Sequence, residues 1–278
     1  MLQPQHVLAA VQRPPQAVAA ASRQARLLLA GAGGALGTQV LHRLLASGLF
    51  AHTDVLTSEP MTMALPGIGH LLTGETVLLP HWPLPTQPYG TAVVMFEPPR
   101  LFNDRERAFF TPTPAELPAL AVWLQACGVH TLVVVLPHAP GGLPDSLKRG
   151  LACMDEQAVA SLGFDRVLLV RSAAAPGRNA LVLQPSLLEK LAQWMLSISS
   201  YMIPASEQPV RAERVAEFVE AALRVLPVGT FVASADLLHR ASVGRRANGA
   251  AAITMTQVVH DWLVDKVIAP DQADATPA

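Results

Sequence analysis

The chain alternates between two patterns of apolar residues. The first is a short, mostly apolar run, which is typical of a parallel strand buried on both faces. Such runs occur at residues 27–30, 54–57, 76–79, 91–96, 131–136 and 166–170. The second places an apolar residue at every third or fourth position, as in an amphipathic helix, at residues 36–45, 117–124, 147–162 and 187–198. This alternation predicts an α/β fold with a doubly wound parallel sheet and a small helical, substrate-side region near the C-terminus.

Glycines follow the first apolar run at once. Gly31, Gly34 and Gly37 form the spacing G-x-x-G-x-x-G, and a helical pattern begins within it. A strand, a glycine turn and a helix in this order let the backbone approach a diphosphate while the first helical amides point at its charge. We therefore predict a nucleotide site in a Rossmann-like domain, and a tight turn without a ligand is the alternative. The candidate residues of this turn are Gly31, Gly33, Gly34, Ala35, Leu36 and Gly37.

Composition narrows the class of protein. Of the 278 residues, 51% are hydrophobic and 15% are charged, and the formal net charge is −1. No basic run and no apolar stretch of membrane-spanning length is present, so we expect a globular cytoplasmic protein without a nucleic-acid partner or a membrane span. The histidines and the two cysteines show no zinc-binding spacing, and we expect no metal site.

An acidic residue follows the second apolar run. Glu59 stands 22 residues after Gly37, with Ser58 beside it. This is close to the distance at which a dinucleotide-binding fold places an acid on the ribose hydroxyls. We predict that Ser58 and Glu59 contact the cofactor, and that NAD is favoured over NADP because a carboxylate repels the additional phosphate. A solvated loop glutamate is the alternative.

Prolines dominate residues 80–118, on both sides of the run at 91–96. They exclude regular structure from most of this excursion. We expect a surface loop packed over the end of the sheet, with a lid or a partner surface as alternatives. Residues 113–116 read T-P-A-E, which predicts a helix-capping box. We expect one domain at 25–268, a flexible extension at 1–24 and a disordered tail at 269–278.

The run at 131–136 leads into the loop PHAPGGLP. Open α/β sheets bind ligands outside the carboxyl ends of their strands. Pro137 and His138 are therefore candidate cofactor contacts, although a histidine in a loop is more often an ordinary surface residue.

These features together resemble a known family. The glycine turn, the run TLVVVL with its loop, and the sequence SLGFDRVLLVRSAAA resemble the extended and atypical short-chain dehydrogenase/reductases. The sequence PVRAERVAEFVEAALRV followed by GTFVAS is similar to their C-terminal segment. The likeness spans roughly residues 26–239 and extends to small oxidoreductases related to the Tat-interacting reductase and to NAD(P)-binding regulators. It implies a Rossmann-like fold with NAD or NADP as the cofactor.

The same resemblance implies catalytic positions. The family carries a serine at the end of its fifth strand, then a tyrosine and, four residues later, a lysine, which together move the substrate proton. Ser172 falls at the serine position and Lys190 at the lysine position. Ser186 stands in place of the tyrosine, and its hydroxyl is too weak an acid to replace a phenol. Ser172 as a plain strand end and Lys190 as a solvated helix residue are the alternatives.

Two functions from different classes are consistent with these residues. One is an NAD(P)-dependent oxidoreductase with altered catalytic residues and a small-molecule substrate. The other is a non-catalytic dinucleotide-binding redox sensor, regulator or assembly factor that meets a protein partner through the proline-rich excursion. A structural subunit with an empty site is a third alternative, and a homo-oligomer is compatible with all of them.

Overall fold

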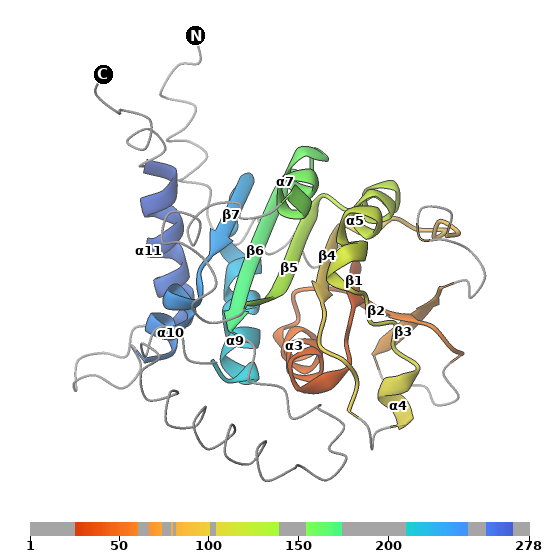
Figure 1. Cartoon of the computed structure of the whole chain (residues 1–278). Helices are drawn as coiled ribbons and strands as arrows, with labels where there is room; N and C mark the ends of the chain where they lie inside the picture. The colour runs from red at the N-terminus through yellow and green to blue at the C-terminus, as the bar shows by residue number, and fades with distance from the viewer. Residues whose placement is uncertain are drawn as a thin grey trace, which may run out of the picture.

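A computed structural model describes residues 26–60, 67–73, 79, 82–100, 104–138, 154–173, 210–243 and 254–268. The strands are β1 (Arg26–Ala30), β2 (His52–Thr57), β3 (Ile68–Leu72), β4 (Thr91–Met95), β5 (Thr131–His138), β6 (Arg166–Ala173) and β7 (Gly229–Ala233). All pair in parallel in one sheet of order β3-β2-β1-β4-β5-β6-β7 (Figure 1). The strand order reverses between β1 and β4, so the predicted doubly wound parallel sheet is confirmed.

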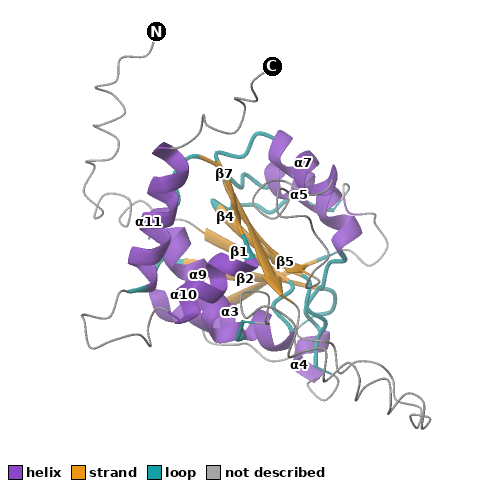
Figure 2. Ribbon diagram, turned by 60° about the vertical axis from the view of Figure 1, so that its left-hand side comes forward, coloured by secondary structure: helices purple, strands orange, loops and turns teal. Residues whose placement is uncertain are grey.

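Helices cover both faces of this sheet (Figure 2). One face carries α3 (Gly34–Ser47), α9 (Ala212–Val225), α10 (Ala235–Val243) and α11 (Met255–Ile268), and the other carries α5 (Leu117–Ala126) and α7 (Met154–Ser161). A short helix, α4 (Asp104–Arg107), lies outside these two layers. The architecture is therefore three layers, with the sheet between two helical layers.

Each central strand contributes to two hydrophobic cores. In β1, Leu27 and Leu29 pack into the core beneath α3 and α9, whereas Leu28 and Ala30 pack into the core beneath α5. Successive side chains of a strand point to opposite faces. A strand that is buried on both faces must therefore be apolar at every position, which explains the unbroken runs in the sequence.

The C-terminal helices belong to the first helical layer. The ring of Trp262 in α11 lies 6.1 Å from that of Phe218 in α9 and 6.3 Å from that of Phe231 in β7, between centroids. An ion pair of 3.2 Å between Arg43 and Glu220 also joins α3 to α9. The predicted C-terminal helical region is thus present and packs directly on the sheet domain.

Most predicted strands are present, and the structure adds one strand that was not predicted, between the second and the fourth. The run predicted at 76–79 lies almost entirely outside the described residues, and its last residue, Leu79, is not in a strand. The described third strand is β3, which the pattern did not predict. It is an edge strand with mostly partial burial and a glycine at position 69, so its sequence lacks the continuous apolar character of the inner strands.

The predicted capping box is confirmed. The N–H of Thr113 donates to Oε2 of Glu116 over 2.7 Å, and a single 3-10 turn (Pro114–Glu116) leads into α5. The predicted extension at 1–24 and tail at 269–278 lie outside the described residues. None of the helices in the described ranges combines the length and the apolar character that a membrane crossing requires.

Candidate functional site

The glycine turn lies at the point where the strand order reverses. Gly31 follows β1 with φ of 76°, and a Cβ at this position would lie 2.0 Å from the carbonyl oxygen of Met95 in β4. A Cβ at Gly37 would lie 2.4 Å from the carbonyl oxygen of Gly31. Glycine at both positions therefore lets α3 begin close to the sheet. The turn delivers the start of α3 to the crevice in which open α/β sheets bind ligands.

The first amides of α3 are bound by two glutamates from beyond β4. The helix has Gly33 at its N-cap and no acidic residue in its first turn, so it cannot satisfy these amides itself. The N–H of Gly34 donates to Oε2 of Glu106 over 2.9 Å, and the N–H of Leu36 donates to Oε2 of Glu97 over 2.5 Å. The amides expected to hold a diphosphate thus hold two carboxylates.

Glu106 lies at the centre of this arrangement, with a side chain that is 3% exposed. In addition to Gly34, Arg100 donates to it from its backbone N–H over 2.8 Å and from Nε and Nη2 over 2.8 and 2.5 Å. Burial alone would raise the pKa of Glu106, but these hydrogen bonds outweigh burial and lower its pKa to about 2. Glu106 is therefore ionised at neutral pH.

We call residues 97–100 and 104–110, which carry both glutamates, the post-β4 segment. Its second part is fixed to the sheet through the backbone: the N–H of Ser58 donates to Ala108 over 2.8 Å, and the N–H of Gly31 donates to Phe110 over 3.0 Å. The ring of Phe110 also lies edge-on to Trp82, with 5.0 Å between centroids. The post-β4 segment therefore covers the glycine turn and the end of β2 together.

This arrangement shows how part of the proline-rich excursion packs. The structure describes residues 82–100 and 104–118 of this excursion, and within them the post-β4 segment packs over the end of the sheet. Phe109 is 7% exposed and pairs with Thr57 in an antiparallel bridge. This part of the chain therefore packs over the end of the sheet, as expected, and its role as a lid or a partner surface stays a prediction.

The predicted cofactor contacts lie along the same edge of the sheet. Ser58 follows β2 directly and its hydroxyl also donates to Ala108 over 3.4 Å, whereas Glu59 is exposed. Pro137 and His138 are the last two residues of β5, and the side chain of Pro137 is exposed. The rest of their loop, residues 139–144, lies outside the described residues.

The predicted catalytic residues are only partly placed. Ser172 pairs in register with Pro137 at the carboxyl edge, but it lies on β6, the sixth strand, whereas the fifth strand ends at His138. The resemblance places the family's serine at the end of the fifth strand. Because Ser172 lies on the sixth strand, the match between Ser172 and that serine needs correction. Ser186 and Lys190 lie outside the described residues, and all three catalytic roles stay predictions.

A second buried glutamate lies at the same edge. Glu156 in α7 binds Arg171 in β6 with 2.6 Å between Oε2 and Nη2, and their side chains are 5% and 3% exposed. Because both charges are removed from water, each depends on its partner. This ion pair joins α7 to the strand that carries Ser172.

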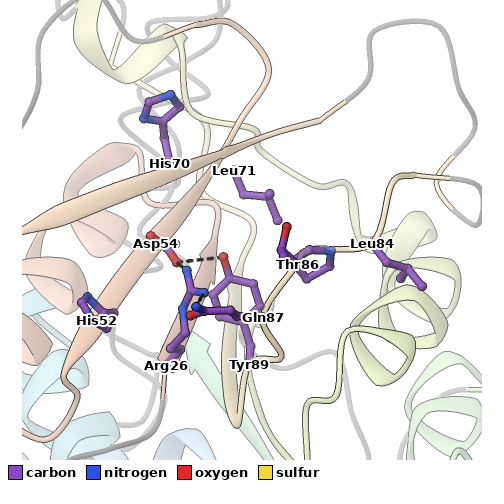
Figure 3. Close-up of a pocket in the computed structure, with 10 residues that line it drawn as sticks. Arg26, His52, Asp54, His70, Leu71, Leu84, Thr86, Gln87 and Tyr89 are labelled. Carbon is purple, nitrogen blue, oxygen red and sulfur yellow. Dashed lines mark hydrogen bonds and ion pairs between the residues drawn. The ribbon is translucent and has the colours of Figure 1, made fainter.

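A polar pocket of about 640 Å³ lies at the opposite edge, where β1, β2 and β3 begin (Figure 3). Its two charged groups pair with each other: Nη2 of Arg26 lies 2.5 Å from Oδ2 of Asp54, and the hydroxyl of Tyr89 donates to the same atom over 2.8 Å. Burial and this hydrogen bond raise the pKa of Tyr89. Across the described ranges, no three His, Cys, Asp or Glu side chains gather as a metal site. We therefore place the candidate site at the carboxyl edge.

The sequence interpretation missed Glu97, Arg100 and Glu106. Glu97 has a recognisable signal, because it follows the buried strand β4 at the place where strand order reverses. Glu106 has none, since it stands in the polar run NDRER and resembles a solvated residue.

Likeness to known proteins is limited to the fold. No family model and no curated relative matches the chain. The chain is similar to a short chain dehydrogenase family protein from Francisella tularensis subsp. tularensis SCHU S4, with 11% identity and a TM-score of 0.41 over 75% of this chain and 96% of that one.

Two further structures show the same level of similarity. UDP-N-acetylglucosamine 4-epimerase from Bacillus cereus has 12% identity and a TM-score of 0.42, covering 86% of this chain and 99% of that one. The Bordetella bronchiseptica enzyme WbmF in complex with NADH has 12% identity and a TM-score of 0.43, covering 90% and 95%. Similarities this distant say nothing about activity, and the fold assignment rests on the sheet order itself.

Proposed function

We propose that this protein binds an NAD-type dinucleotide at the carboxyl edge of its sheet, with the diphosphate on the turn at residues 31–37. One observation carries the proposal: the N–H groups of Gly34 and Leu36 each bind a carboxylate oxygen at the start of α3. A diphosphate offers two negatively charged groups, as the two glutamates do, and their oxygens can accept hydrogen bonds from the same amides. The residues of the turn therefore fit the group that the fold implies.

The remaining contacts follow from the sheet edge. Ser58 and Glu59 directly follow β2, the strand next to β1, which is where a dinucleotide-binding fold recognises the adenosine ribose. We assign Glu59 to the ribose hydroxyls and expect it to disfavour the phosphate of NADP. Pro137 and His138, on the other side of the strand-order reversal, are the proposed contacts for the other half of the dinucleotide.

A non-catalytic sensor or regulator is the favoured form of this function. The carboxylates of Glu97 and Glu106 occupy the amides that a continuously working dehydrogenase would leave to its cofactor. Ser186 also stands in place of the family's tyrosine, which removes the phenol needed for ordinary carbonyl reduction. An oxidoreductase that uses Ser172 and Lys190 on a small-molecule substrate is the second candidate.

Titration of the purified protein with NAD, NADH, NADP and NADPH tests the proposal. A ligand that binds only the folded state raises the unfolding temperature by mass action. We expect the rise with NAD or NADH to exceed that with the phosphorylated pair, and Glu59→Gln to remove this preference. A folded sample whose unfolding temperature responds to none of the four would contradict the proposal.

A further inference from the structure

We propose that Glu97 and Glu106 form a built-in competitor for the dinucleotide, so that the described state is closed and the ligand binds only after these two side chains leave the start of α3. This inference rests on the proposed function. It adds regulation to the site: binding of the dinucleotide is coupled to release of the post-β4 segment.

The competition is for the same atoms. Each backbone N–H carries one hydrogen, so Gly34 and Leu36 cannot satisfy a glutamate and a diphosphate oxygen at once. The backbone of the segment also covers the turn, because a Cβ at Gly33 would lie 3.3 Å from Cα of Pro99. A diphosphate therefore cannot approach these amides while the segment stays in place.

The post-β4 segment has a fixed part and a releasable part. Residues 108–110 are fixed by backbone hydrogen bonds to Gly31 and Ser58 and by the buried ring of Phe109. The glutamates, in contrast, are held at the start of α3 by their side chains, and Arg100, the partner of Glu106, is 54% exposed. Release thus breaks side-chain hydrogen bonds and leaves the hydrophobic core intact.

Arg100 is placed to change partners during release. Its Nη2 lies 2.5 Å from Oε1 of Glu106 and 3.2 Å from Oγ1 of Thr38 in the first turns of α3. When Glu106 leaves, this guanidinium loses its carboxylate partner and becomes available to an anionic ligand. An arginine pairs with phosphate as readily as with carboxylate, so the ligand replaces the glutamate in an existing set of donors.

The expected consequence is a weaker apparent affinity for the ligand. A protein that is open for about 1% of the time binds its ligand about 100-fold more weakly than its open form does. Hydrogen bonds keep Glu106 ionised in mild acid, and the signal that we propose to open the site is the concentration of the ligand.

The test compares NAD dissociation constants, measured by calorimetry, for the full chain and for Glu97→Gln/Glu106→Gln. Asp165→Asn is the matched control, since it removes a negative charge from the exposed turn before β6 at the opposite edge. We expect at least ten-fold tighter binding for the double variant and no change for the control. Equal or weaker binding by the double variant would overturn this inference alone. A lack of binding by every folded protein would overturn the proposed function with it.

A second variant covers the case in which the double variant does not fold. The Cβ of a residue at position 33 would lie 3.4 Å from Cβ of Pro99, close to the separation of about 3.5–4.5 Å in disulfides. Gly33→Cys/Pro99→Cys should therefore lock the closed state when oxidised. We expect oxidation to weaken NAD binding relative to the same variant in dithiothreitol. Equal affinity of the two redox forms would overturn the inference.

Discussion

Two buried glutamates at the carboxyl edge each pair with an arginine, but the two arginines differ in their exposure to solvent. Glu106 binds Arg100, and Glu156 binds Arg171, with 2.5 and 2.6 Å between the closest atoms. Arg100 is 54% exposed, whereas Arg171 is 3% exposed. The first pair covers the amides of a glycine turn, and the second joins a helix to a central strand.

The exposure of the arginine decides what each pair can do. If Glu106 leaves, Arg100 is still solvated, and an anionic ligand can take the place of the carboxylate. If Glu156 leaves, buried Arg171 loses a carboxylate at 2.6 Å in the protein interior, which is strongly unfavourable. A buried carboxylate is therefore displaceable when its cationic partner faces solvent, and structural when that partner is also buried.

Glu156→Gln should give the largest loss of stability. Because this change leaves the positive charge of buried Arg171 without its carboxylate, we expect the free energy of unfolding to fall by about 3–5 kcal/mol in urea titrations. The control is Glu156→Leu/Arg171→Met, which removes both charges and should recover most of the loss. A loss below about 1 kcal/mol for the single variant would show that the two pairs do not differ as described.

Glu106 should stabilise the protein in a pH-dependent way. Its folded pKa of about 2 lies below the ordinary value of 4.5, so its contribution is complete above that ordinary value and is lost as the pH falls towards 2. At pH 7 we expect the free energy of unfolding of the unchanged protein to exceed that of Glu106→Gln by at most about 3 kcal/mol. This difference should shrink through pH 4 and 3 in urea titrations at each pH. A difference that does not depend on pH would contradict the assignment.

Glu97→Gln should have the smallest effect on stability. Glu97 is only partly buried and binds a single amide, that of Leu36, so we expect a loss of about 1 kcal/mol in the free energy of unfolding. Exposed Glu59 offers the control, because Glu59→Gln should change stability by less than about 0.5 kcal/mol. Equal losses for the two variants would remove Glu97 from the group that holds the post-β4 segment in place.

The sequence predicted the buried architecture well, for a physical reason. Strands such as β1 and β5 are buried on both faces and are therefore apolar at nearly every position. The glycine turn was also predicted from the sequence. A Cβ at position 31 would clash with Met95, so this position is restricted to glycine. The edge strand β3 was missed because one-sided burial leaves no continuous run.

The residues of the candidate site were harder to predict from the sequence. Glu106 and Glu156 are acidic residues in polar stretches, and sequence patterns assign such residues to the surface. Their burial depends on arginines that the fold brings to them from another element or turn, Arg171 from β6 and Arg100 from beyond β4. Such pairing arises from tertiary structure, and no local spacing reveals it.

The central claim is that a dinucleotide and the post-β4 segment exchange places on the same amides. Hydrogen–deuterium exchange of the full chain, with and without saturating NAD, measures this exchange directly. We predict faster exchange in peptides that span residues 97–107, where the N–H of Arg100 loses its bond to Glu106, and unchanged exchange in α7 and β6, which the Glu156–Arg171 pair holds together. Bound NAD with unchanged or slower exchange at residues 97–107 would contradict the account.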